Sequence, residues 1–143
     1  MKKVIVGIAV MALTMAVGLR AQDGSKSSGS HLGTWELASF RYGTNQPSFT
    51  DFPKTRHRIK LITETHYTWV EYGDTTKKVT ASAGGTYSLD GNTYTESKDF
   101  GLDMDTYLGQ KHVYTIRVEG DKFFLSGSLS DGLKIEEVWR RVK

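Results

Sequence analysis

Two glutamates and one histidine are the residues of this sequence best suited to acid–base chemistry. Glu96 and Glu137 lie inside segments that read as β-strands, and His66 stands at the start of another. A carboxylate and an imidazole within hydrogen-bond reach can exchange protons with a substrate. Because His66 follows a turn, where exposure is as expected as burial, the spacing leaves open whether it meets either glutamate.

Glu137 is the most unusual of the three, because the predicted strand pairing turns it toward an apolar face. A three-residue turn over residues 130–132 places Leu125 opposite Glu137. The same pairing places Phe123 opposite Trp139, whereas a two-residue turn would divide the apolar residues between two faces. A carboxylate on an apolar face needs a cation or hydrogen-bond donors. Glu137 therefore either accepts a hydrogen bond from a ligand or forms an internal pair with an inward Arg, Lys, His or Tyr.

Aromatic side chains on the same strands supply the rest of a candidate binding surface. An Asp-Gly turn at residues 90–91 sets Tyr87 opposite Tyr94 and Gly85 opposite Glu96. Tyrosines on such a face either pack with their hydroxyls satisfied or contact a ligand. The predicted ligand-binding residues are Trp69, Tyr87, Tyr94, Glu96, Tyr114, Leu125, Glu137 and Trp139.

The sequence contains few features that indicate a metal site, a cofactor site or a nucleic-acid-binding surface. The chain has no cysteine, and its four histidines lack the close paired spacing of metal ligands. No G-x-S-x-G motif marks a serine nucleophile. The formal charge of +3 equals the contribution of Lys2, Lys3 and Arg20 near the start of the chain, and no Lys/Arg block lies elsewhere. We expect no cofactor, no metal and no nucleic-acid partner.

Residues 1–21 read as a signal peptide. Lys2 and Lys3 precede an apolar run over residues 4–17, and small residues follow it. That run is short for a membrane span, which needs about 20 residues. The small polar residues 22–31 predict a flexible linker, and the folded domain is expected over residues 32–143. The mature protein is expected in the periplasm or outside the cell, without a membrane span and, lacking cysteine, without a lipid anchor.

The elements that must position these side chains are β-strands. Residues 33–42, 55–63, 66–72 and 77–83 are rich in β-branched and aromatic residues, and Gly/Asp turns separate the strands that follow. A further turn, at Gly120, sets Val118 opposite Phe123. The fold predicted is all-β, a single up-and-down antiparallel barrel of eight to ten strands. Residues 43–54 should form a loop or a short helical cover, and residues 99–110 an irregular stretch that holds a short strand or an external segment.

Three blocks of sequence resemble an uncharacterised family of secreted bacterial lipocalin-like (calycin) domains. They are HRIKLITETHYTWVEY, AGGTYSLDGNTYTE and GLKIEEVWRRV, and the G-x-W signature of lipocalins stands at Gly33 and Trp35. The resemblance implies a β-barrel that encloses a cavity for an apolar or amphipathic molecule. It also implies that Trp35 packs at the closed end of the barrel beneath an arginine of the last strand, either Arg140 or Arg141, as a structural contact.

The sequence departs from the fatty-acid-binding branch of the calycins. That branch carries two helices where residues 43–54 are too few, and it presents Arg-x-Tyr where this chain has Glu137 and Trp139. An inward glutamate would repel a carboxylate at that position. The function expected is binding of a small apolar or amphipathic molecule, without enzymatic activity. The alternatives are a barrel enzyme that uses Glu96, Glu137 and His66, or an interaction module whose barrel is filled by its own side chains; the oligomeric state is left open.

Overall fold

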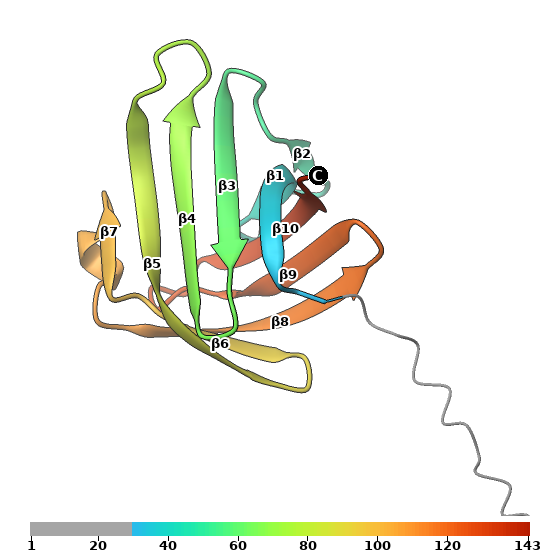
Figure 1. The fold of residues 1–143 in the computed structure, drawn as a ribbon, viewed down its shortest axis with the longest axis vertical. Coiled ribbons are helices and arrows are strands. Elements are labelled where there is room, and N and C mark those ends of the chain that lie inside the picture. The colour runs from blue at the N-terminus through green and yellow to red at the C-terminus, as the bar shows by residue number, and fades with distance from the viewer. Residues whose placement is uncertain (1–29) are drawn as a thin grey trace, which may run out of the picture.

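A closed antiparallel barrel forms the protein, as the computed structural model of residues 30–143 shows (Figure 1). Eight strands make the wall, each paired with its neighbour along the chain, and the last pairs with the first. They are β1 (Gly33–Tyr42), β3 (Arg56–Ile62), β4 (His66–Gly73), β5 (Val79–Asp90), β6 (Thr93–Ser97), β8 (Lys111–Glu119), β9 (Lys122–Ser128) and β10 (Lys134–Arg141). The predicted all-β, up-and-down architecture is confirmed.

Three short elements lie outside this closed wall. Strand β2 (Thr50–Asp51) pairs with β1, and β7 (Phe100–Leu102) pairs with β5. The 3₁₀ turn η1 (Asp105–Tyr107) follows β7, so the stretch over residues 99–110 is irregular with one short strand, as predicted. Within residues 30–143 no helix is long and apolar enough to cross a membrane.

Strand β5 was predicted as two segments and is one long strand that changes partners. Its first part pairs with β4 and β7, and its last part pairs with β6. The change occurs near Gly85, where an added Cβ would lie 2.0 Å from the carbonyl oxygen of Ser97. Only a glycine allows this close approach. The segment that follows β6 can therefore pass next to Gly85 and continue into β7, which pairs with β5.

The turns decide which residues face each other, and two of the three predicted registers are confirmed. The three-residue turn before β10 ends in Gly132, which has a φ of +85°, and it pairs Leu125 with Glu137. The turn at Gly120 pairs Val118 with Phe123 as predicted.

The register predicted at residues 90–91 is wrong by two residues. The turn uses Gly91 and Asn92, so that Leu89 pairs with Tyr94, and Tyr87 with Glu96. A glycine at the first turn position suits a type II′ hairpin, and the segment Asp-Gly-Asn contains both turn signals. Because the shift is even, every side chain keeps its predicted face.

The barrel interior contains two regions of different composition. One region, the apolar end, is built from Trp35, Leu37, Ile116, Val118 and Phe123, all at least nine-tenths buried. The other, the charged cluster, consists of Arg58, Lys60, Glu71, Glu96, Lys98 and Glu137. Five of these six residues are likewise buried and Arg58 is largely buried, with 19% of its side chain exposed.

Trp35 closes the apolar end, and Arg141 is its cation partner. The guanidinium carbon of Arg141 lies 4.0 Å from the centre of the Trp35 ring. Arg140, the other arginine expected there, is exposed and lies 3.6 Å from Glu36. A Cβ at Gly33 would meet Arg141 Nη1 at 2.9 Å, so glycine at this position makes room for the arginine.

Contacts of the domain begin two residues before the predicted boundary. Arg141 donates to the carbonyl oxygen of Ser30 at 2.6 Å, and the Trp35 indole donates to the carbonyl oxygen of His31 at 2.8 Å. His31, which was expected in the linker, thus packs against the closed end. The predicted signal peptide over residues 1–21 and residues 22–29 of the linker predicted over residues 22–31 lie outside the described residues.

Candidate functional site

A cavity of about 240 Å³ lies inside the barrel next to the charged cluster. Strand β1 begins near Trp35 at the closed end, and Tyr42, its last residue, lies on the cavity wall. The cavity is therefore reached from the end of the barrel opposite Trp35. It is lined by Tyr42, Arg58, Lys60, Trp69, Glu96, Lys98, Met104, Tyr107, Tyr114, Leu125, Leu129, Leu133, Ile135, Glu137 and Trp139.

Strand β3 carries cations into the barrel by alternation. Residues two apart on a strand share a face, so Arg58, Lys60 and Ile62 point to the same side. Lys60 is 2% exposed, whereas Leu61 beside it is 42% exposed. The usual pattern of apolar inside and charged outside is therefore reversed over residues 58–61. On the neighbouring strand β4, Glu71 lies directly opposite Arg58 and carries the opposite charge.

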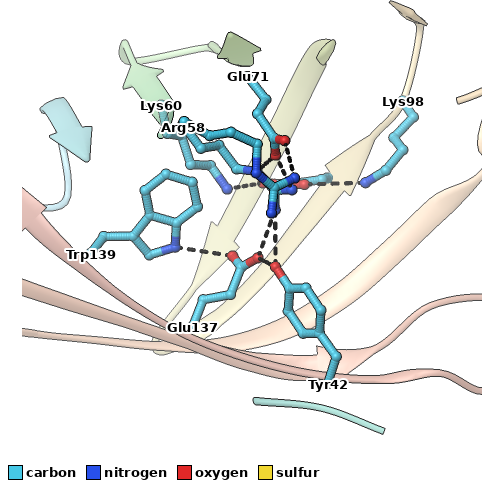
Figure 2. A network of polar contacts seen from close by, with 9 residues as sticks. Tyr42, Arg58, Lys60, Glu71, Lys98, Glu137 and Trp139 are labelled. Atoms are coloured by element: carbon cyan, nitrogen blue, oxygen red, sulfur yellow. Dashed lines mark hydrogen bonds and ion pairs between the residues drawn. The ribbon is translucent and has the colours of Figure 1, made fainter. Parts of the chain in front are cut away.

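Arg58 links two carboxylates (Figure 2). Its Nε and Nη2 donate to Glu71 Oε2 at 2.9 and 2.5 Å, and its Nη1 donates to the Tyr42 hydroxyl at 2.9 Å. The Tyr42 hydroxyl donates to Glu137 Oε1 at 2.5 Å, and Trp139 Nε1 donates to Glu137 Oε2 at 3.0 Å. Glu137 thus has internal partners, the second of the two arrangements expected for it. Burial and the charge of Glu137 raise the pKa of Tyr42 well above its usual range, so this hydroxyl keeps its proton and donates.

Glu96 lies between two lysines. Lys60 Nζ donates to Glu96 Oε1 at 2.5 Å, and Lys98 Nζ lies 3.5 Å from Glu96 Oε2. These three side chains are only 3–5% exposed. Burial lowers the pKa of Lys98, Glu96 opposes this shift, and the positive charge of Lys60 adds to it. Two ammonium groups therefore share one carboxylate in a region without bulk water.

His112 extends the charged cluster on strand β8. It is 2% exposed, and it is the cross-strand neighbour of Glu96. Neither ring nitrogen has a hydrogen-bond partner among residues 30–143. Burial, followed by the charge of Lys98, lowers the pKa of His112 below its usual value. The imidazole is neutral at pH 7 as a result.

The remaining wall of the cavity is apolar and is covered by two loops. Ile135, Leu129 and Leu133 come from β10 and the turn that precedes it, and Met104 comes from the stretch before η1. Tyr107 of η1 donates its hydroxyl to Asp131 of the β9–β10 turn at 2.8 Å. This bond joins the two loops at the mouth of the cavity.

Six of the eight predicted ligand-binding residues line this cavity, and two do not. Trp69, Glu96, Tyr114, Leu125, Glu137 and Trp139 are in its wall. Tyr87 lies near the closed end, where its hydroxyl donates to the carbonyl oxygen of Thr63 at 2.6 Å and contacts His31. Tyr94 is fully buried beneath Tyr87, with ring centres 4.8 Å apart, and is a packing residue.

His66 does not join the two glutamates. It is exposed at the start of β4, and its Nδ1 contacts the neighbouring Thr65 hydroxyl at 2.7 Å. The acid–base set of Glu96, Glu137 and His66 is therefore not assembled, because β4 carries Tyr67 rather than His66 into the barrel. In the part of the chain that the structure describes, no group of three His, Asp or Glu side chains is placed to hold a metal ion.

The cations of the site are what sequence reasoning missed. Arg58, Lys60 and Lys98 were assigned no role, because charged residues on strands normally face solvent. One signal was present: the hairpin over residues 56–73 sets Arg58 directly opposite Glu71 across the strand pair. Oppositely charged cross-strand neighbours on one face indicate a paired position.

Comparisons with known proteins identify the fold. A lipocalin-like protein from Bacteroides uniformis superposes with a TM-score of 0.54 at 17% sequence identity, over 78% of this chain and 97% of that one. An uncharacterised protein from Bacteroides eggerthii superposes with a TM-score of 0.55 at 10% identity, over 78% of this chain and 98% of that one. No protein-family model matches the sequence, and no curated protein does. The lipocalin-like fold predicted from the sequence is confirmed.

Proposed function

We propose that this lipocalin-like barrel is a binding protein for one small amphipathic molecule. The observation that carries the proposal is the mixed lining of the cavity, in which charged groups and hydroxyls lie beside Ile135, Leu129 and Leu133. Ligand sites typically combine an apolar lining with a few placed polar groups. A purely apolar molecule would offer no hydrogen-bond acceptor to the ammonium group of Lys98, whose contact to Glu96 is long, so an amphipathic ligand fits better.

The volume of the cavity limits the ligand. About 240 Å³ is below the roughly 300–1,000 Å³ of sites for drug-sized molecules. At about 30 Å³ per molecule of liquid water, it corresponds to about eight waters. A short-chain amphiphile matches this space, and a long acyl chain would have to extend through the mouth between η1 and the β9–β10 turn.

Binding rather than catalysis is the activity proposed. Each carboxylate of the cluster is engaged by cations or donors, and the exposed His66 does not reach the cavity. We also propose that the protein acts in the periplasm or outside the cell, which residues 1–21 support. The N-terminus of the exported protein, mapped by mass spectrometry, tests that location.

Titration with octan-1-ol tests the binding function. Trp69 and Trp139 line the cavity, so ligand entry should change their fluorescence with one molecule bound per chain. Ile135→Phe fills part of the cavity and should weaken binding at least tenfold. Leu61→Phe places the same ring on the exposed outer face and should bind like the wild type. An unchanged signal in the wild type would favour a barrel closed to ligands, and native mass spectrometry of protein from its own host would then show no added mass.

A further inference from the structure

We infer that the polar end of the ligand is an anion, a carboxylate or a phosphate, seated on the ammonium group of Lys98. This inference rests on the proposed binding function and names the ligand class that the same cavity selects. It follows from two features of the cluster: where its charges balance, and which of its polar atoms are already engaged.

The first feature is a local excess of positive charge. Around Arg58 the charges balance, because Arg56 and Arg58 face the two carboxylates of Glu71 and Glu137. Around Glu96 they do not, because Lys60 and Lys98 share this one carboxylate. A buried charge without a full partner is costly, and an incoming anion would supply that partner.

The second feature is the incomplete hydrogen bonding of Lys98. An ammonium group has three N–H donors, yet among residues 30–143 Lys98 Nζ has one long contact to an acceptor. Its one acidic contact, Glu96 Oε2, lies at 3.5 Å, while Lys60 bonds the other oxygen of that carboxylate at 2.5 Å. The Lys98 side chain is 5% exposed and lines the cavity, and its Nζ lies 6.0 Å from the ring centre of Tyr114, which lines the cavity too, so an anion bound there would be its neighbour.

The carboxylates of the cluster, in contrast, offer little to a cationic ligand. Glu71 accepts from Arg56 through Oε1 and from Arg58 through Oε2. Glu137 accepts from Tyr42 through Oε1 and from Trp139 through Oε2. The donors of Arg58 are directed at Glu71 and Tyr42. Lys60 Nζ has a short bond to Glu96 and aromatic rings around it, so Lys98 is the charged group of the wall with the most donors to spare.

The anion would occupy a position different from the carboxylate site expected from the fatty-acid-binding calycins. The last strand presents Glu137 to the cavity, and that charge disfavours an anion beside β10. Lys98 follows β6 directly and enters the cavity from that strand's side of the barrel. The ligand should therefore place its head toward Lys98 and its chain toward Ile135 and Leu133.

A series of eight-carbon probes with different head groups tests the inference. Octanoate, octyl phosphate, octan-1-ol and octylamine are compared at pH 7 by calorimetry and by tryptophan fluorescence. One charge-assisted hydrogen bond corresponds to about 10- to 100-fold in affinity, so at least one anion should bind that much more tightly than octan-1-ol. Octylamine should bind most weakly. The two anionic arms tell a carboxylate ligand from a phosphate ligand.

Variants then assign the effect to one residue. Lys98→Met keeps the length of the side chain without its charge, and it should reduce anion affinity to that of octan-1-ol. Lys78→Met removes an exposed lysine and should change nothing. Lys98→Arg should keep a preference for anions.

The outcomes separate this inference from the binding function. Equal affinities for all head groups, a preference for octylamine, or an anion preference that survives Lys98→Met would overturn the inference and leave the binding function standing. Absence of binding by every probe would overturn both. If Lys98→Met does not fold, the head-group series on the wild type decides whether the ligand is an anion, and Lys98→Arg, with a changed affinity for the anionic probes alone, decides whether it sits on residue 98.

Discussion

The apolar end and the charged cluster occupy the same barrel interior and hold together in different ways. At the apolar end, Trp35 and Phe123 pack with ring centres 5.3 Å apart, and each side chain contributes through the area it buries. In the charged cluster, each group is tolerated only because a named partner faces it. Side chains of the apolar end can therefore be considered one at a time, whereas those of the cluster must be considered as sets.

The largest expected effect tests the apolar end. Phe123→Ala removes a fully buried ring and should lower the free energy of unfolding by about 3–5 kcal/mol. Phe124→Ala removes the same ring from the outer face, where it is half-buried beneath Arg117, and should cost less than half as much. Chemical denaturation measures both values. Similar losses at the two positions would contradict the assigned faces of β9.

A smaller effect tests whether the cluster behaves as a set. Glu96→Gln leaves Lys60 and Lys98 buried without a carboxylate and should cost about 3 kcal/mol. Lys98→Met should cost much less, because Lys60 keeps its bond to Glu96. The same denaturation measurement gives both values. If Lys98→Met proved as damaging as Glu96→Gln, Lys98 would be needed for the fold and would not be spare for a ligand.

The smallest effect concerns pH and asks whether the cluster accepts one more cation. Burial lowers the pKa of His112 below the 6.5 of an unfolded histidine, so the unfolded chain binds more protons below pH 6.5. Stability should therefore fall as the pH drops from 6.5 toward the folded pKa, by at most about 1.4 kcal/mol per pH unit from this one group. Melting temperatures between pH 5 and 7 measure the slope. His112→Phe should flatten it, and a slope that is unchanged in this variant would show that His112 does not cause the loss of stability.

The apolar end could be predicted from the sequence more completely than the charged cluster, for a physical reason. Apolar burial follows the alternation of the strands and the geometry of the turns. The turn ending at Gly132 was therefore enough to place Leu125, Glu137 and Trp139 on the inner face. On β3 the same rule fails, because Ile59 and Leu61 alternate with Arg58 and Lys60, and the apolar pair turns outward.

The long-range partners of Glu137 could not be predicted from the sequence, for a different reason. Two of them, Tyr42 and Arg58, come from β1 and β3, and their side chains reach Glu137 on β10 only after the barrel closes. A predicted hairpin register cannot supply such contacts between distant strands. The position of Glu137 was therefore predictable, and its contact with Tyr42 was not.

The pairing of β1 with β10 has a consequence for how the chain folds. Residues near the start of the domain, such as Trp35, are hydrogen-bonded neighbours of residues at its other end, such as Arg141. Bringing such distant segments together costs loop-closure entropy before any contact compensates it. Proteins dominated by non-local strand pairing fold in milliseconds to seconds rather than microseconds. The last strand therefore closes the barrel. Until β10 pairs with β1 and β9, each of these two strands has an unpaired edge. Without that closure the barrel has no enclosed interior in which to hold a ligand.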